Sequence, residues 1–248
     1  MGRPLVFTIA VLAGIAAMPS AQTPADRQRA RTHNQLGWEL MTAESWEAAA
    51  RSFQQAIDID PGFAYAHYGL GRANIAIKKY QAAIAALSTC RNLYQAGTGR
   101  QFSNQQDAQR ARQDRLTEID EQVRQVQTMP TSLQQQDLLR QLNNQRRDIQ
   151  NAIQSGSGLS IETTVPPWVS LSLGSALFRA GRMADAEREF KAATNADPKF
   201  GEAHSNLAVV YLETGRIAEA DAAIRAAKKA GFRVNPQLEQ DIKQRKQP

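Results

Sequence analysis

The chain has 248 residues, of which 42% are hydrophobic, 22% charged and 6% aromatic, and its formal net charge is +6. Ala, Gln, Arg, Leu and Glu are abundant while β-branched residues are sparse, which excludes an all-β sandwich and predicts an almost entirely helical protein. One Cys and three His exclude a disulfide scaffold and a zinc finger.

Residues 1–21 have the layout of a secretory signal peptide. An apolar run from Leu5 to Ala17 follows a basic N-terminus, and polar sequence begins after the small residue Ala21. The run is shorter than the roughly 20 apolar residues that a membrane-spanning helix needs, although an uncleaved anchor stays an alternative. We therefore expect an exported protein, periplasmic or secreted after cleavage, with a short N-terminal tail over 22–29.

A unit of 34 residues occurs twice in 30–97 and twice again in 167–234. Each unit has the same order of small and large apolar positions. These are Leu36, Gly37, Leu40, Trp46, Ala49, Phe53, Ala56 and Pro61 in the first unit; Leu70, Gly71, Asn74, Tyr80, Ala83, Leu87 and Cys90 in the second; Leu173, Gly174, Leu177, Met183, Ala186, Phe190, Ala193 and Pro198 in the third; and Leu207, Ala208, Tyr211, Ile217, Ala220, Ile224 and Ala227 in the fourth.

Each unit predicts two helices joined by a short turn, because apolar residues recur at i, i+3, i+4 and i+7 on both sides of a polar or Gly-containing stretch. Small residues such as Gly37 and Ala49 let the two helices approach closely, and larger ones such as Phe53 fill the space between neighbouring hairpins. The prolines after Asp60 and Asp197 end the second helices of the first and third units. The pattern resembles the tetratricopeptide repeat (TPR) family, whose unit is a helical hairpin of this length, and implies an all-α fold of stacked hairpins.

Residues 98–166 interrupt the repeats and are rich in Gln and Arg. Apolar residues with seven-residue spacing favour an antiparallel, coiled-coil-like pair of helices at about 104–128 and 132–154. These residues are Leu116, Ile119, Val123, Val126, Leu138, Leu142, Ile149 and Ala152. Pro130 would separate the helices, Ser132 with Gln135 has the form of a capping box, and 155–158 would be a flexible joint. A mostly mobile linker is the alternative for this segment.

A short helix is expected in the C-terminal segment, 235–248. Asn235 and Pro236 have the form of an N-cap followed by a proline in the first turn. Leu238 and Ile242 are four residues apart, so they would lie together on the last repeat. We expect this helix to cap the array.

The TPR resemblance also implies a place for a partner, because in that family the first helices of successive units line a concave groove that holds a peptide or a helix. The matching residues here are Arg31, Asn34, Trp38 and Met41 from the first unit, Tyr65, Tyr68, Arg72 and Ile75 from the second, Trp168, Leu171 and Phe178 from the third, and Glu202, Ser205, Val209 and Leu212 from the fourth. Aromatic residues, Met and Arg often supply binding energy at interfaces. Whether a partner covers these rings or the chain's own tail or arm does so stays open.

No motif predicts catalysis: there is no Ser/His/Asp order, glycine-rich phosphate loop or HExxH. His33, His67 and His204 share one repeat position, but positions on successive hairpins roughly 10 Å apart cannot share a metal ion. Cys90 occupies a small-residue core position, which is typical of a buried, inert thiol. We expect no metal, no cofactor and no small-molecule substrate.

Two functions fit these observations. The first is a non-catalytic adaptor of the cell envelope that binds a protein or peptide partner in the TPR groove. The second is a structural protein in which the 104–154 arm self-associates into a homodimer. Nucleic acid is not expected as a partner, because the basic residues are interspersed with acids and the protein is expected to be exported.

Overall fold

The computed structural model describes residues 23–97, 100–101, 104–127, 133–156, 160–161 and 164–245. The expected signal peptide, the turn at Pro130 with Ser132, and the second half of the predicted joint at 155–158 lie outside these ranges. Among the helices that the structure describes, none combines the length and the apolar character that crossing a membrane requires.

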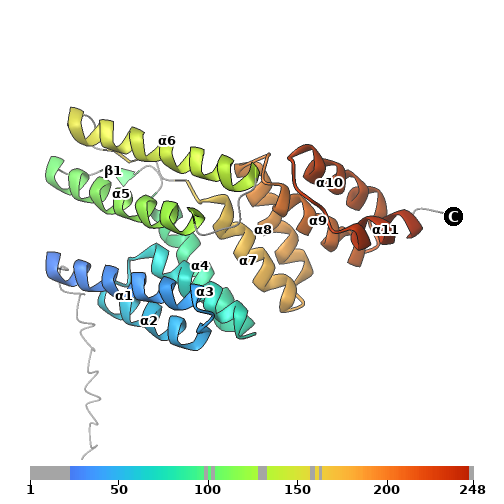
Figure 1. Ribbon diagram of the computed structural model, residues 1–248, viewed down its shortest axis with the longest axis horizontal. Coiled ribbons are helices and arrows are strands. Elements are labelled where there is room, and N and C mark those ends of the chain that lie inside the picture. The colour runs from blue at the N-terminus through green and yellow to red at the C-terminus, as the bar shows by residue number, and fades with distance from the viewer. Residues whose placement is uncertain are drawn as a thin grey trace, which may run out of the picture.

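Within the described residues, four helical hairpins carry the four predicted repeats (Figure 1). In chain order the helices are α1 (Pro24–Thr42) with α2 (Trp46–Ile59), α3 (Ala64–Ala76) with α4 (Tyr80–Gly97), α7 (Pro167–Arg179) with α8 (Met183–Ala196), and α9 (Gly201–Glu213) with α10 (Ile217–Lys229). The two helices of each hairpin pack on one another. The predicted all-α fold of helical-hairpin repeats is confirmed.

The close packing within a hairpin depends on a glycine that faces a phenylalanine. A Cβ atom placed on Gly37 would lie 2.6 Å from Cε1 of Phe53, and one placed on Gly174 would lie 2.6 Å from Cε1 of Phe190. Both rings are buried. Gly69 of the next hairpin presses on Phe53 from the other side, where a Cβ would lie 2.4 Å from the ring. The pairing of small with large residues is therefore what sets the distance between the helices.

The two repeat pairs stack into one array, because α4 packs against α7 and a single apolar core runs from the second repeat to the fourth. Leu173 on α7 is 1% exposed in this contact, and the matching Leu207 is 5% exposed where α9 packs on α8. Leu36 occupies the same position in the first repeat but is 43% exposed. No described hairpin precedes α1, so Leu36 has no helix to pack against.

Between α4 and α7 the chain forms the arm, which we define as α5 (Gln105–Gln127) and α6 (Leu133–Ser155). The two helices pack along each other and bury a small apolar cluster of Ile119, Val123, Val126 and Leu142. At the base of the arm, strands β1 (Arg100–Gln101) and β2 (Ser160–Ile161) pair antiparallel. Figure 1 shows α5 lying between α6 and α1.

The first and last helices of the array begin with similar capping residues. At α1, the hydroxyl of Thr23 accepts a hydrogen bond from the amide of Asp26, whose carboxylate accepts one from the amide of Thr23. At α11 (Pro236–Arg245), the side chain of Asn235 accepts a hydrogen bond from the amide of Gln237. α11 buries Ile242 against the last repeat and so covers the C-terminal end of the core.

Candidate functional site

The first helices of the four hairpins form one continuous face. α1 contacts α3, α3 contacts α7, and α7 contacts α9. Because these helices approach each other directly, they lie on the concave side of the stack, and we call this side the inner face. The groove residues predicted from the first three units all lie on α1, α3 and α7.

Aromatic side chains form a continuous row on the inner face. The ring of Trp38 lies 5.2 Å from that of Tyr65 and 5.9 Å from that of Tyr68, measured between centroids. Tyr68 in turn lies 4.3 Å from Trp168, so the row connects α1 through α3 to α7. Edge-to-face and stacked contacts of this kind hold the rings in fixed positions.

Arg72 is the exposed cation of this row. Its guanidinium carbon lies 6.0 Å from the centroid of Trp38 and 5.8 Å from that of Tyr68, within the range of cation–π attraction. The pKa of Arg72 is raised above its ordinary value, chiefly by Tyr68, so the guanidinium stays protonated. Burial raises the pKa of Glu202 on α9 above its ordinary value, although the charge of Arg72 acts in the opposite direction.

The arm covers the part of the inner face that belongs to the first repeat pair. Three carboxylates of α5, spaced i, i+4 and i+7, contact the first repeat pair, and we call them the acidic stripe: Asp114, Glu118 and Glu121. Asp114 forms an ion pair with Arg31, and Glu121 accepts a hydrogen bond from the amide group of Asn34. Glu118 accepts a hydrogen bond from the hydroxyl of Tyr94 on α4.

Burial in this contact changes the protonation of the arm's charged groups. It raises the pKa of Glu118 to about 8, with the nearby charge of Glu121 as a second cause. It raises the pKa of Glu121 to about 7 against the opposing effect of Arg124. It also lowers the pKa of Arg115, whose guanidinium lies 2.8 Å from a carboxylate oxygen of Glu118, to about 10. Keeping these three side chains charged in the contact therefore costs desolvation free energy.

A cavity of about 380 Å³ remains beside the acidic stripe, between α1, α4 and α5. Arg27, Arg31, Tyr94 and Asp114 are among the residues that line it. On the same helix α1, the side-chain oxygen of Asn34 is buried without a hydrogen-bond partner in the described part of the chain. α5 thus covers the inner face without filling it.

The predicted groove residues divide into covered and accessible ones. Asn34 and Tyr65 are fully buried, Tyr68 and Leu171 are 8% exposed, and Arg31 is half-buried against the arm. The accessible residues are Trp38, Met41, Ile75, Trp168 and Phe178, which are half-buried, and Arg72. Of the fourth unit, Ser205 and Leu212 are buried while Glu202 and Val209 are half-buried. The assignment of this set to a partner stays a prediction.

The acidic stripe is the part of the site that the sequence analysis missed. The apolar spacing in 98–166 predicts the arm, and the predicted residues Ile119, Val123 and Val126 of α5 pack with Leu142 of α6 in the arm's own cluster. The i, i+4, i+7 spacing of Asp114, Glu118 and Glu121 was present in the sequence as a signal. Charged residues are common on helix surfaces, however, so this spacing does not by itself indicate a contact.

Two of the three equivalent histidines have a structural contact. Nε2 of His67 lies 3.0 Å from the carbonyl oxygen of Pro61, and Nε2 of His204 lies 3.0 Å from that of Pro198. Because a carbonyl oxygen only accepts, each ring donates, which ties the start of a first helix to the preceding turn. Across the described residues, no three His, Cys, Asp or Glu side chains come together as metal ligands. Cys90 is fully buried, and burial raises the pKa of its thiol well above its ordinary value.

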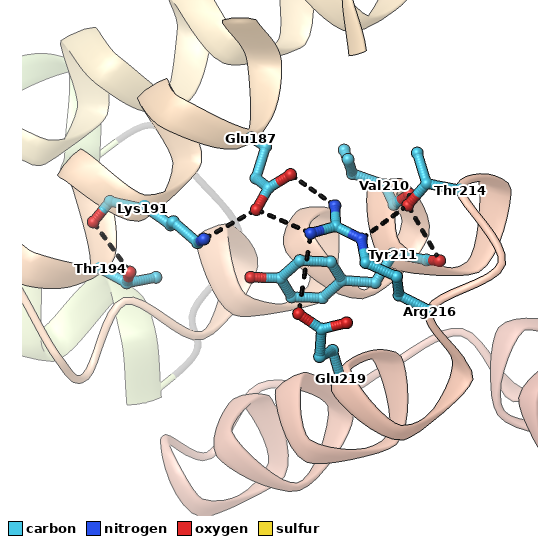
Figure 2. A network of polar contacts seen from close by, with 8 residues as sticks. All are labelled: Glu187, Lys191, Thr194, Val210, Tyr211, Thr214, Arg216 and Glu219. Carbon is cyan, nitrogen blue, oxygen red and sulfur yellow. Dashed lines mark hydrogen bonds and ion pairs between the residues drawn. The ribbon is translucent and has the colours of Figure 1, made fainter. Parts of the chain in front are cut away.

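A separate polar network joins the third repeat to the fourth, as Figure 2 shows. Glu187 on α8 accepts hydrogen bonds from Arg216 at the start of α10, and its carboxylate lies 2.7 Å from Nζ of Lys191. The guanidinium of Arg216 lies 4.5 Å from the ring centroid of Tyr211. These partners lower the pKa of Glu187 to about 2, chiefly through the hydrogen bond from Arg216. The network lies outside the predicted groove and connects neighbouring hairpins.

Comparisons with known proteins agree with this architecture. Family models described as tetratricopeptide repeat match residues 34–90 and 177–238. The crystal structure of MamA aligns with a TM-score of 0.52 at 17% identity, covering 84% of this chain and 81% of that one, which shows a shared fold. PilW, a type IV pilus biogenesis factor, gives 0.40 at 14% identity over 88% and 86% of the two chains, and a thermophilic TPR protein of Thermus thermophilus gives 0.36 at 18% over 87% and 98%. No curated protein matches the chain.

Proposed function

Because the chain belongs to the tetratricopeptide repeat family, we propose that it is a non-catalytic adaptor that binds a segment of another protein on its inner face. The signal-peptide-like residues 1–21 support a place for this adaptor in the cell envelope, in the periplasm or outside the cell. The partner is then another exported protein.

The observation that carries the proposal is the exposed Arg72 beside half-buried rings. Trp38 offers apolar surface that is only partly covered, and Arg72 offers guanidinium donors next to it. Phe178 is a further half-buried ring, on α7 of the same face. Such a surface suits a segment with apolar side chains and a carboxylate, because the rings bury the former and the guanidinium pairs with the latter. Arg next to aromatic residues is typical of the few positions that dominate binding energy at interfaces.

A crosslinking pull-down from the native cell envelope tests this function. The bait is compared with the double variant Arg72→Ala with Phe178→Ala, and with Arg225→Ala as a control. Arg225 is also an exposed arginine, but it pairs with Asp221 on the outer helix α10. Proteins recovered with the bait and the control should be lost with the double variant, while circular dichroism stays unchanged. Equal recovery with all three baits would contradict the proposal.

Self-association through the arm has less support. The apolar residues of the arm, such as Ile119 and Val123, are buried inside the α5–α6 pair, and the acidic stripe faces the chain's own repeats. The described part of the arm therefore offers no large apolar surface to a second copy. Light scattering of the full chain distinguishes the two functions, because the structural alternative requires a dimer.

A further inference from the structure

The acidic stripe of α5 meets partners that come from the repeats. Arg31 and Asn34 belong to α1 and Tyr94 belongs to α4, and each of them contacts one carboxylate of the stripe. The ring of Tyr65 lies fully buried on α3 between these helices and feels the charges of both glutamates. The first repeat pair thus holds a helix by three acidic side chains on one side of it.

The contact between the stripe and the repeats is made by polar groups. Ile119, Val123 and Val126 of α5 pack in the arm's own cluster, which is separate from the cores of the repeats. The cavity of about 380 Å³ shows that α5 does not fill the space next to its stripe. α5 and α6 together can therefore leave the repeats, and another helix can take the place of α5 there, without opening the arm's cluster or the cores of the repeats.

We propose that α1, together with Tyr94 of α4, forms a receptor on the first repeat pair for a helix with acidic side chains at i, i+4 and i+7, and that α5 occupies this receptor as an internal ligand. A helix of the same chemistry from a partner protein replaces α5. The inference rests on the proposed function, because it names the kind of segment that the adaptor binds. It adds that the receptor residues Arg31, Asn34 and Tyr94 become available only when α5 moves away.

An internal ligand lowers the apparent affinity for an external one, since only the fraction of molecules with an open receptor can bind. Weakening the docking of α5 should therefore strengthen binding of a free helix. Asp114→Ala with Glu121→Ala removes two of the contacts and leaves the receptor unchanged. Glu118 is kept, because it lies 2.8 Å from the buried guanidinium of Arg115 and its removal would leave that charge without its partner.

The experiment measures fluorescence anisotropy of a labelled synthetic peptide of residues 105–127, titrated with the full chain. The double variant Asp114→Ala with Glu121→Ala should bind the peptide at least about tenfold more tightly than the wild type. The matched control is Asp120→Ala with Asp148→Ala, which removes two carboxylates outside the stripe: Asp120 lies 3.6 Å from Arg146 of α6 and Asp148 is exposed. The control should bind as weakly as the wild type.

Two further measurements identify the receptor and the stripe. Adding Arg31→Ala to the double variant should weaken peptide binding at least about tenfold, because the ion pair to Asp114 of the peptide is lost. A peptide that itself carries Asp114→Ala and Glu121→Ala should bind poorly to every variant. Circular dichroism of each variant checks that the helices are retained.

The inference is overturned if the double variant binds the peptide no more tightly than the matched control, or if Arg31→Ala leaves binding unchanged. It is also overturned if light scattering shows that the wild type forms a dimer which the double variant loses, since the occupant would then be α5 of a second copy. None of these results affects the pull-down with Arg72→Ala and Phe178→Ala. Failure of the receptor is therefore distinguishable from failure of the adaptor function.

Discussion

The two repeat pairs have the same core and different surfaces. Gly37 faces Phe53 in the first pair as Gly174 faces Phe190 in the second, at the same distance. On the inner face, however, the position of Trp38 is taken by Ser175 in the second pair. The core positions fix the distance between helices and are the same in both pairs. The surface positions are available for binding, and they differ between the two pairs.

The pairs also differ in what holds their hairpins together. The second pair has the network around Glu187 and Arg216, which bridges two hairpins (Figure 2), and α11 covers its end. The matching positions of the first pair are Ala50 and Lys79, which cannot form that network. The first pair is contacted by the arm instead. We infer that the second repeat pair keeps its contacts, whereas the contacts between the first repeat pair and the arm can be exchanged.

The largest expected effect tests whether the two cores are equivalent. Phe53→Ala and Phe190→Ala each remove a buried ring packed against glycine, so each should lower the free energy of unfolding by about 3 to 5 kcal/mol. Urea denaturation followed by circular dichroism measures both. If the two variants differed by several kcal/mol in lost unfolding free energy, the two rings would be packed differently despite the shared sequence pattern.

Leu173→Ala and Leu36→Ala compare the stacked repeat with the first one. Leu173 is 1% exposed where α7 packs on α4, so its truncation should cost about 2 to 5 kcal/mol of unfolding free energy. Leu36 is 43% exposed, and its truncation should cost less than about 1 kcal/mol. The same urea titration checks this. Similar losses for both would contradict the stacking of the two pairs or the open position of Leu36.

The hairpins were predictable because their signal is local and repeated. Gly37 with Phe53 recurs as Gly174 with Phe190, and such a period fixes helices, turns and core positions together. The stacking of α4 on α7 was not predictable, because the 98–166 segment separates the two pairs in the sequence. The contact of the arm with the repeats was left open for another reason. Charged pairs such as Arg31 with Asp114 are far apart in the chain and have no periodic signal that would identify the partner.

Docking of the arm should weaken as the pH rises. Glu118 and Glu121 have raised pKa values in the docked arm, about 8 and about 7, because burial disfavours their charged forms. Because these pKa values are raised in the docked arm, docking is most stable below pH 4.5, the ordinary pKa of a glutamate. Docking loses this stability as the pH rises through the pKa values of the docked arm. The charged and polar groups that face these carboxyls are Arg31, Asn34, Tyr94, Arg115, Gln122 and Arg124.

Hydrogen exchange of the α5 amides, corrected for the intrinsic effect of pH, measures this docking. Protection of α5 should fall by about tenfold or more between about pH 5 and about pH 8.5, while protection of α8 in the second pair changes little. Glu121→Gln should flatten the profile, because the amide does not titrate. A pH-independent protection of α5 in the wild type would contradict the assignment.

The smallest expected effect concerns the turn inside each hairpin. In the second pair this turn places Gly181 and Gly215 at φ values of 77° and 74°, whereas the matching residues of the first pair are Glu44 and Lys78, at 54° and 61°. In the left-handed region, a residue with a Cβ destabilises the folded state by about 1 to 2 kcal/mol relative to glycine. Glycine in turn stabilises the unfolded chain by about 0.5 to 1 kcal/mol through its greater conformational freedom, which offsets part of this difference.

Lys78→Gly should therefore raise the free energy of unfolding by about 0.5 to 1 kcal/mol, and Gly215→Lys should lower it by a similar amount. No described atom lies within 4 Å of a Cβ placed on Gly215, so this exchange tests the backbone conformation rather than packing. Urea midpoints of the two variants, measured beside the wild type, provide the comparison. A lower unfolding free energy for Lys78→Gly would contradict this expectation. It would mean that the Lys78 side chain stabilises the fold by more than its left-handed backbone destabilises it, so that the two turns are not equivalent.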